Sequence, residues 1–84
     1  MEYRIDCAEI ATRPQLHRTL AQTLNFPEWY GHNLDALHDL LTTRTCPTRL
    51  VLENWENFAP LGQGFRRVME DAAEENPNFS VIFS

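Results

Sequence analysis

The sequence predicts an α/β domain with a small three-stranded parallel sheet packed against three or four helices. Strand-like and helix-like segments follow one another in the order strand, two helices, strand, helix, strand. This order favours parallel strands joined by right-handed crossovers. The chain has 84 residues, and a chain of that length buries only about 60% of its unfolded surface, which supports a single core. We therefore expect one domain over residues 1–84.

The first part of the chain predicts one strand and one helix. Residues 3–7 alternate apolar and charged side chains, which is the two-residue period of a half-buried strand. Thr12 is a suitable N-cap, and Pro14 is tolerated in the first helical turn after it. Leucines spaced by four residues then mark one helical face, so we expect this helix to continue to about Asn25.

A loop and a second helix follow. Pro27 disfavours the helical conformation at the residue before it, so we expect a loop over residues 28–32 with a positive φ at Gly31. Asn33 can cap a short helix that runs to about Leu41. Leucines spaced by three and four residues form the predicted core stripe of this helix, and its other face is polar and acidic.

The second half of the chain predicts two strands around a third long helix. Residues 49–53 and 79–83 are short, largely apolar segments bounded by polar residues and turn signals. Residues 54–64 contain one proline and two glycines, so we expect an irregular segment there, followed by a helix over residues 64–75. Three apolar side chains of the irregular segment are expected to point into the core: Trp55, Phe58 and Leu61.

The charge of the chain indicates what kind of partner it has. The net charge is −5, and the seven basic residues are all arginines, scattered along the sequence. Such a chain lacks the lysine-rich and arginine-rich stripe that neutralises phosphates, so we expect no direct binding of nucleic acid. An acidic surface instead attracts a basic protein and accelerates encounter with it.

Two further expectations concern the compartment. The N-terminal residues lack the apolar stretch of a signal peptide, and no segment approaches the ~20 apolar residues of a membrane span. We therefore expect a cytoplasmic protein that does not contact a membrane. Cys7 and Cys46 lack the spacing of a metal or redox motif, and we expect two free thiols in a reducing compartment.

The most informative polar residues are Asp35 and Asp39. Residues four apart on a helix are neighbours, and like charges there cost a few tenths of a kcal/mol. A solvated polar face is one interpretation, since acidic proteins carry such pairs on exposed helices. The aromatic residues Trp29 and Tyr30 lie a few positions before the helix, and aromatic side chains around a charged centre are typical of protein interfaces. The pattern therefore also fits a protein-binding site.

Other chemistry is less well supported. Imidazoles and carboxylates at residues 32, 35, 38 and 39 could meet as metal ligands, but no HExxH motif or cysteine pair accompanies them. Paired carboxylates also occur in hydrolases, yet no nucleophile motif or phosphate-binding loop is present. We expect no enzymatic activity, metal or cofactor. The acidic residues at positions 70, 71, 74 and 75 either promote solubility or extend the Asp35–Asp39 pair.

Residues 27–41 resemble the inhibitory loop and second helix of the barstar family. The motif Tyr-Gly-x-Asn-Leu-Asp-Ala-Leu at residues 30–37 is a specific signal, and weaker similarity covers nearly the whole chain. The resemblance implies a three-stranded parallel sheet packed with helices, in agreement with the element order. It also implies inhibition of a basic secreted ribonuclease of the barnase type by a monomer that forms a 1:1 complex.

The resemblance assigns roles to individual residues. Asp39 would enter the cationic active site of the enzyme where a substrate phosphate stands, and Asp35 would take a second cationic contact. A third acidic contact would come from the third helix, at Asp71, or at Glu70 if one insertion separates the sequences. The remaining partner-binding residues would form the loop and helix entry around these carboxylates: Trp29, Tyr30, Gly31, Asn33 and Leu34.

Two positions depart from the family pattern. His38 stands where barstar has tryptophan, and Thr43-Arg44 replaces a glycine-tryptophan pair. Both positions are expected at the rim of the interface, where Arg44 would repel a basic enzyme unless an acidic residue faces it. We therefore expect a different cognate ribonuclease. The alternative function keeps the fold and the acidic surface but changes the partner, as in an immunity or adaptor module for another basic protein.

Overall fold

The computed structural model describes all residues 1–84, and it confirms the predicted α/β class and element order. Three strands and three α-helices are joined by two short 3-10 helices. In chain order the elements are β1 (Glu2–Asp6), η1 (Cys7–Glu9), α1 (Arg13–Thr23), α2 (Leu34–Thr42), β2 (Thr48–Glu53), η2 (Trp55–Asn57), α3 (Ala59–Glu75) and β3 (Phe79–Phe83).

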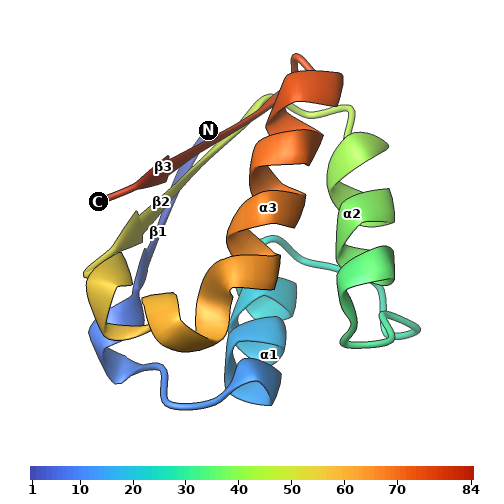
Figure 1. The fold of residues 1–84 in the computed structure, drawn as a ribbon. Coiled ribbons are helices and arrows are strands. Elements are labelled where there is room, and N and C mark those ends of the chain that lie inside the picture. Colours follow the sequence, from blue (N-terminus) through green and yellow to red (C-terminus); the bar gives the residue numbers. More distant parts are fainter.

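The sheet has the order β1-β2-β3, and both pairs of neighbouring strands are parallel. All three α-helices lie on one side of it (Figure 1). The two-residue period of the strands explains this arrangement, because alternate residues point to opposite faces. Ile5 and Leu52 are paired across β1 and β2 and are buried against the helices. On the other face, Arg4 forms ion pairs of 3.0 and 3.3 Å with Glu2 and Glu53.

Helix caps predicted from the sequence are present at both short helices. The Thr12 hydroxyl accepts a hydrogen bond of 3.2 Å from the amide of Gln15, and α1 begins at the next residue. Asn33 caps α2 in the same way. Asn25, just beyond α1, has a φ of 57°, which is the left-handed conformation that often follows a helix end.

The third helix begins five residues earlier than predicted, at Ala59 instead of residue 64. Pro60 lies in its first turn, where the missing amide costs no hydrogen bond. Gly62 is required by packing, because a Cβ there would lie 2.6 Å from the ring of Trp55. The expectation for Leu61 was wrong, since its side chain is 38% exposed. Trp55 and Phe58 are buried as predicted.

Asn76 joins the ends of the two helices that carry most of the polar candidates. Its buried amide donates hydrogen bonds of 2.9 Å to the carbonyls of Leu41 and Arg44, and its side-chain oxygen accepts from the amide of Asn78. This residue therefore fixes the C-terminal end of α2 against the C-terminal end of α3.

The helices and the two cysteines can be compared with what the sequence predicts. None of the helices is both long and apolar enough to span a lipid bilayer. Cys7 is buried and Cys46 is exposed, and both are free thiols. Burial raises the pKa of the Cys7 thiol to about 11, with a smaller contribution from the neighbouring Asp6 charge.

Candidate protein interface

The candidate residues lie on α2, on the loop before it and on the adjacent side of α3. The two helices run side by side in the same direction (Figure 1). The two helices contact each other along their length. Near their starts, a Cβ at Gly64 of α3 would meet Leu34 of α2. Farther along, His38 contacts Glu75, and the Asn76 side chain donates a hydrogen bond to the carbonyl of Leu41 at the end of α2. The pair forms a rigid support for the polar side chains that it presents.

Asn33 connects the loop to the helix. Its side-chain oxygen accepts a hydrogen bond of 2.8 Å from the amide of Ala36, which caps α2. Its side-chain amide donates one of 3.2 Å to the carbonyl of Gly31. Because a Cβ at Gly31 would lie 2.8 Å from this amide, glycine permits the close approach. The loop conformation is thus set by the residue that starts the helix.

The positive φ predicted for Gly31 was wrong. The left-handed residue of the loop is His32, with a φ of 51°, and no glycine of the chain has a positive φ. Histidine is among the few non-glycine residues that adopt this conformation more often than average. Gly31 is needed because a larger residue would lie too close to Asn33. From the sequence alone, a loop glycine required for a positive φ cannot be told from one required for a close contact.

The two adjacent aromatic residues of the loop separate into different environments. The Trp29 side chain is 69% exposed, whereas Tyr30, which we expected beside it at the surface, is 5% exposed and belongs to the core cluster. The amide of Tyr30 donates a hydrogen bond of 3.0 Å to the carbonyl of Pro27, so the chain turns sharply here. This turn sends one ring outward and the other inward.

Tyr30 anchors the loop to α1. Its hydroxyl shares a buried hydrogen bond of 2.5 Å with Nδ1 of His17, and its ring contacts the edge of Phe26 and the ring of His32. Burial raises the pKa of the Tyr30 hydroxyl. Burial also lowers the pKa of His17, and the nearby His32 adds to this effect. Both effects favour a neutral hydrogen-bonded pair beneath the loop.

Asp35 and Asp39 are both exposed on α2. Asp35 lies in the first turn, where the helix dipole favours a negative charge, but Asp39 lies beyond the reach of that effect. Neither carboxylate takes part in the ion pairs of the protein, which leaves both free to accept hydrogen bonds from a cationic partner.

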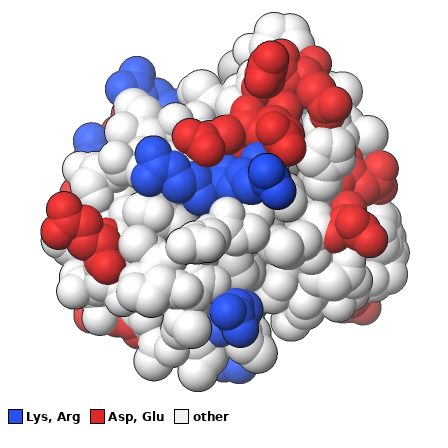
Figure 2. Space-filling view, viewed as in Figure 1, with Lys and Arg blue, Asp and Glu red and all other residues white.

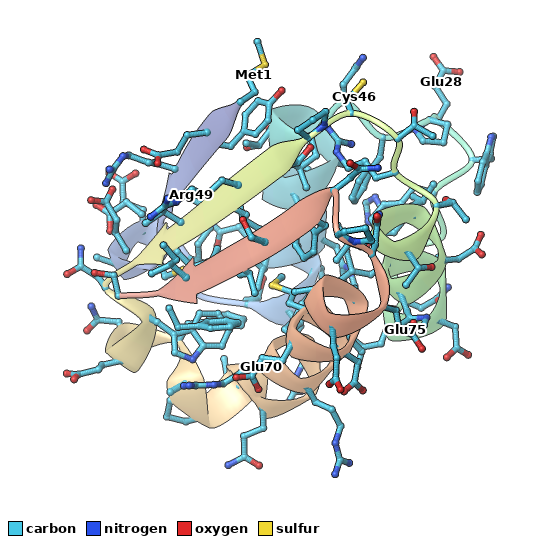
Figure 3. The ribbon with its side chains drawn as sticks, turned by 90° about the horizontal axis from the view of Figure 1, so that it is seen from above. Met1, Glu28, Cys46, Arg49, Glu70 and Glu75 are labelled. Atoms are coloured by element: carbon cyan, nitrogen blue, oxygen red, sulfur yellow. The ribbon has the colours of Figure 1, made fainter.

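Helix α3 adds carboxylates beside them. Glu75 lies 3.0 Å from Nε2 of His38, and Asp71 precedes Glu75 by four residues, which turns it only about 40° away around the helix. Glu70 is about 140° away and pairs with Arg66 at 3.5 Å. Figure 3 shows Glu75 between α3 and α2, with Glu70 on the other side of α3. Asp71 is therefore better placed beside α2 than Glu70.

We call the exposed carboxylates of Asp35, Asp39, Asp71 and Glu75 the acidic face. Figure 2 shows acidic side chains over the upper part of α3 and others at the right over α2. Basic side chains cross the middle of α3 below the upper group. The charge of this surface is therefore divided between two regions of opposite sign.

Arg44 is less available than expected for a rim residue. It is half-buried, and its guanidinium donates hydrogen bonds of 2.6 Å to the Thr48 hydroxyl and 3.1 Å to the carbonyl of Leu24. These contacts join the end of α1 to the start of β2. Part of its side chain therefore supports the fold, and its charge is directed toward these groups.

The acidic face itself is open. The protein has two grooves of about 480 and 360 Å³, and the smaller one is bordered by Asn33 and Leu34 at the start of α2. Neither groove is lined by a carboxylate of the acidic face. No group of three or more His, Cys, Asp or Glu side chains is placed to hold a metal ion. An open, charged surface with an exposed aromatic side chain suits contact with another protein.

Sequence reasoning named Glu75 only as one of four acidic residues of the third helix, and its contact with His38 was not predicted. It gave His17 no role. His17 supports the loop from α1, and no local pattern links it to Tyr30, which follows 13 residues later.

Comparisons with known proteins bear on what such a surface binds. Residues 1–84 match the family described as "Barstar (barnase inhibitor)". The chain is also 45% identical to a protein of Bacillus subtilis (strain 168) named "Putative ribonuclease inhibitor YrdF". That similarity covers 93% of this chain and 92% of the Bacillus protein.

Proposed function

This chain belongs to the barstar family, and from that membership we propose that it is a ribonuclease inhibitor that blocks the cationic active site of a barnase-type enzyme. The proposal assigns it no catalytic activity of its own. We further propose that it acts in the cytoplasm as a monomer and forms a 1:1 complex with its partner.

The observation that carries the mechanism is that the neighbouring carboxylates of Asp35 and Asp39 form no ion pair within the protein. They project from one exposed helix face and have no cation of their own to neutralise them. A ribonuclease must hold a phosphate with cationic side chains, and a carboxylate can accept the same hydrogen bonds from arginine. Asp39 would thus occupy a phosphate position, with Asp35 bound to a neighbouring cation.

The loop supplies the apolar part of the proposed contact. Trp29 offers a large exposed ring next to the charged centre, and interface energies concentrate in such aromatic side chains. Tyr30 would contribute indirectly, by holding the loop in shape through His17. Because this shape exists before binding, less conformational entropy would be lost in the complex.

An inhibition assay tests this function. The purified protein would be titrated into a panel of basic ribonucleases that includes barnase, with cleavage of a fluorescent RNA as the readout. We expect at least one enzyme to lose its activity with an equivalence point at one inhibitor per enzyme.

A panel in which every ribonuclease keeps full activity would contradict the proposal. The immunity or adaptor alternative would then be favoured if pull-down from native lysate captured a basic protein without nuclease activity.

A further inference from the structure

His38 occupies an unusual place on the acidic face. It lies on α2 between Asp35 and Asp39, and its Nε2 atom is 3.0 Å from the Glu75 carboxylate of α3. Imidazole changes charge between about pH 5 and 8, whereas carboxylates and guanidinium groups ordinarily do not. His38 is the imidazole in direct contact with a carboxylate of this face.

The surroundings of His38 are dominated by negative charge. The charged groups on the two adjoining helix sides are Asp35 and Asp39 on α2 and Asp71 and Glu75 on α3, with Arg67 one turn before Asp71. Arg44, beyond the end of α2, directs its guanidinium to Leu24 and Thr48. Only Glu75 contacts the imidazole as an ion-pair partner.

We propose that the His38–Glu75 pair is a pH-responsive element that sets how strongly the acidic face attracts a cationic partner. With neutral His38, Glu75 keeps its full negative charge and adds to the face. Protonated His38 neutralises Glu75 and places a positive charge next to Asp39, so a cationic protein is held less tightly. The consequence for binding rests on the proposed function, whereas the ion pair itself is a property of the free chain.

The ion pair is tested without any partner. Unfolding by urea would be measured for the wild type, His38→Gln, Glu75→Gln and the double variant at pH 5.5 and pH 8.0. Both side chains are partly exposed, so we expect a coupling of roughly two- to fivefold in the unfolding constant at pH 5.5. At pH 8.0 the two substitutions should act independently.

Equal coupling at both pH values would overturn the proposal. Glu56→Gln serves as the matched control, because Glu56 is an exposed carboxylate on η2 without an ion pair. Its substitution should show no coupling to His38→Gln at either pH.

The effect on binding is tested with barnase as the probe. Calorimetric titration at low salt would compare the wild type with His38→Gln at the same two pH values. We expect the ratio of Kd at pH 5.5 to Kd at pH 8.0 to be about five- to tenfold larger for the wild type, since one extra positive charge then faces the enzyme.

The ionisable groups of barnase are the same in both experiments, so their effect on Kd cancels when the wild type is compared with His38→Gln. Equal ratios would overturn the proposal. If neither protein bound barnase at either pH, the same titration would use the ribonuclease that the inhibition panel identifies. The double-mutant cycle in urea would still decide whether His38 and Glu75 form the pH-responsive pair.

Discussion

The Tyr30 hydroxyl lies 2.5 Å from Nδ1 of His17, inside the core and directly beneath the exposed loop. This contact joins the residue after Trp29 to the middle of α1. The most exposed aromatic ring of the candidate interface is therefore held in place by its buried neighbour. Substitution of Tyr30 should therefore change stability, whereas substitution of Trp29 should change binding, and the two effects can be measured separately.

Stability should fall in mild acid because of His17. The pKa of His17 is lowered in the folded protein from the ordinary value of 6.5, first by burial and then by the charge of His32. The unfolded chain takes up its proton first as the pH falls. The free energy of unfolding should therefore be highest above about pH 7 and decline as the pH drops from about 6.5 through the folded pKa.

Urea unfolding between pH 8 and 5 measures this decline, and His17→Gln should flatten it. Asp6 acts in a separate window, because hydrogen bonds from Asn54 and from the amide of Ala8 lower its pKa. Its contribution is lost only below about pH 4. A decline with pH that His17→Gln leaves unchanged would refute the role of His17.

Removing the Tyr30 hydroxyl should destabilise the fold. Tyr30→Phe leaves Nδ1 of the buried His17 without its partner, and an unsatisfied buried polar group costs about 1–3 kcal/mol. Tyr3→Phe is the matched control, since its hydroxyl contacts only the Met1 sulfur at the surface and its loss should cost less than about 0.5 kcal/mol. Equal losses in chemical denaturation would show that the His17 contact does not stabilise the loop.

Two glycines of α3 should respond differently to alanine. At Gly62 the new Cβ would lie 2.6 Å from the rigid Trp55 ring, so we expect a loss of about 1–3 kcal/mol. At Gly64 it would lie 2.7 Å from the end of the flexible Leu34 side chain, which can move. The helix preference of alanine, worth about 1 kcal/mol, should then leave Gly64→Ala near neutral. Thermal unfolding of both variants checks the order, and a greater loss at Gly64 would contradict it.

Trp29 should matter for binding and little for folding. Its side chain is 69% exposed, so Trp29→Ala should change the unfolding free energy by less than about 0.5 kcal/mol. If the ring packs on the enzyme, the same change should weaken the complex by more than about 1 kcal/mol, or roughly fivefold. Calorimetry against the inhibited ribonuclease provides the affinity, and an unchanged Kd would remove Trp29 from the interface.

Most of the fold could be predicted because its signals are local. The strand periods, the caps at Thr12 and Asn33, and the leucine stripes all report on residues close in sequence. The start of α3 could not, because Gly62 is tolerated there only through its contact with Trp55. A glycine near a proline predicts the end of a helix, and only the packing of the Trp55 ring against Gly62 explains why the helix includes it.

The site could be predicted in part for the same reason. The neighbouring positions of Asp35 and Asp39 follow from helical spacing alone. The inward turn of Tyr30 depends on His17, and the contact of Glu75 with His38 depends on how two helices pack. Contacts of this kind link distant segments, and a single sequence carries no direct signal for them.

The central claim is that Asp39 takes a phosphate position in a ribonuclease active site. Calorimetric titration of the inhibited ribonuclease should compare Asp39→Ala with Glu56→Ala, an exposed carboxylate on η2 away from the acidic face. Loss of one partner of a buried ion pair costs about 3 kcal/mol or more, so Asp39→Ala should weaken the complex by more than about a hundredfold. Glu56→Ala should leave Kd within about twofold, and equal losses for the two variants would contradict the claim.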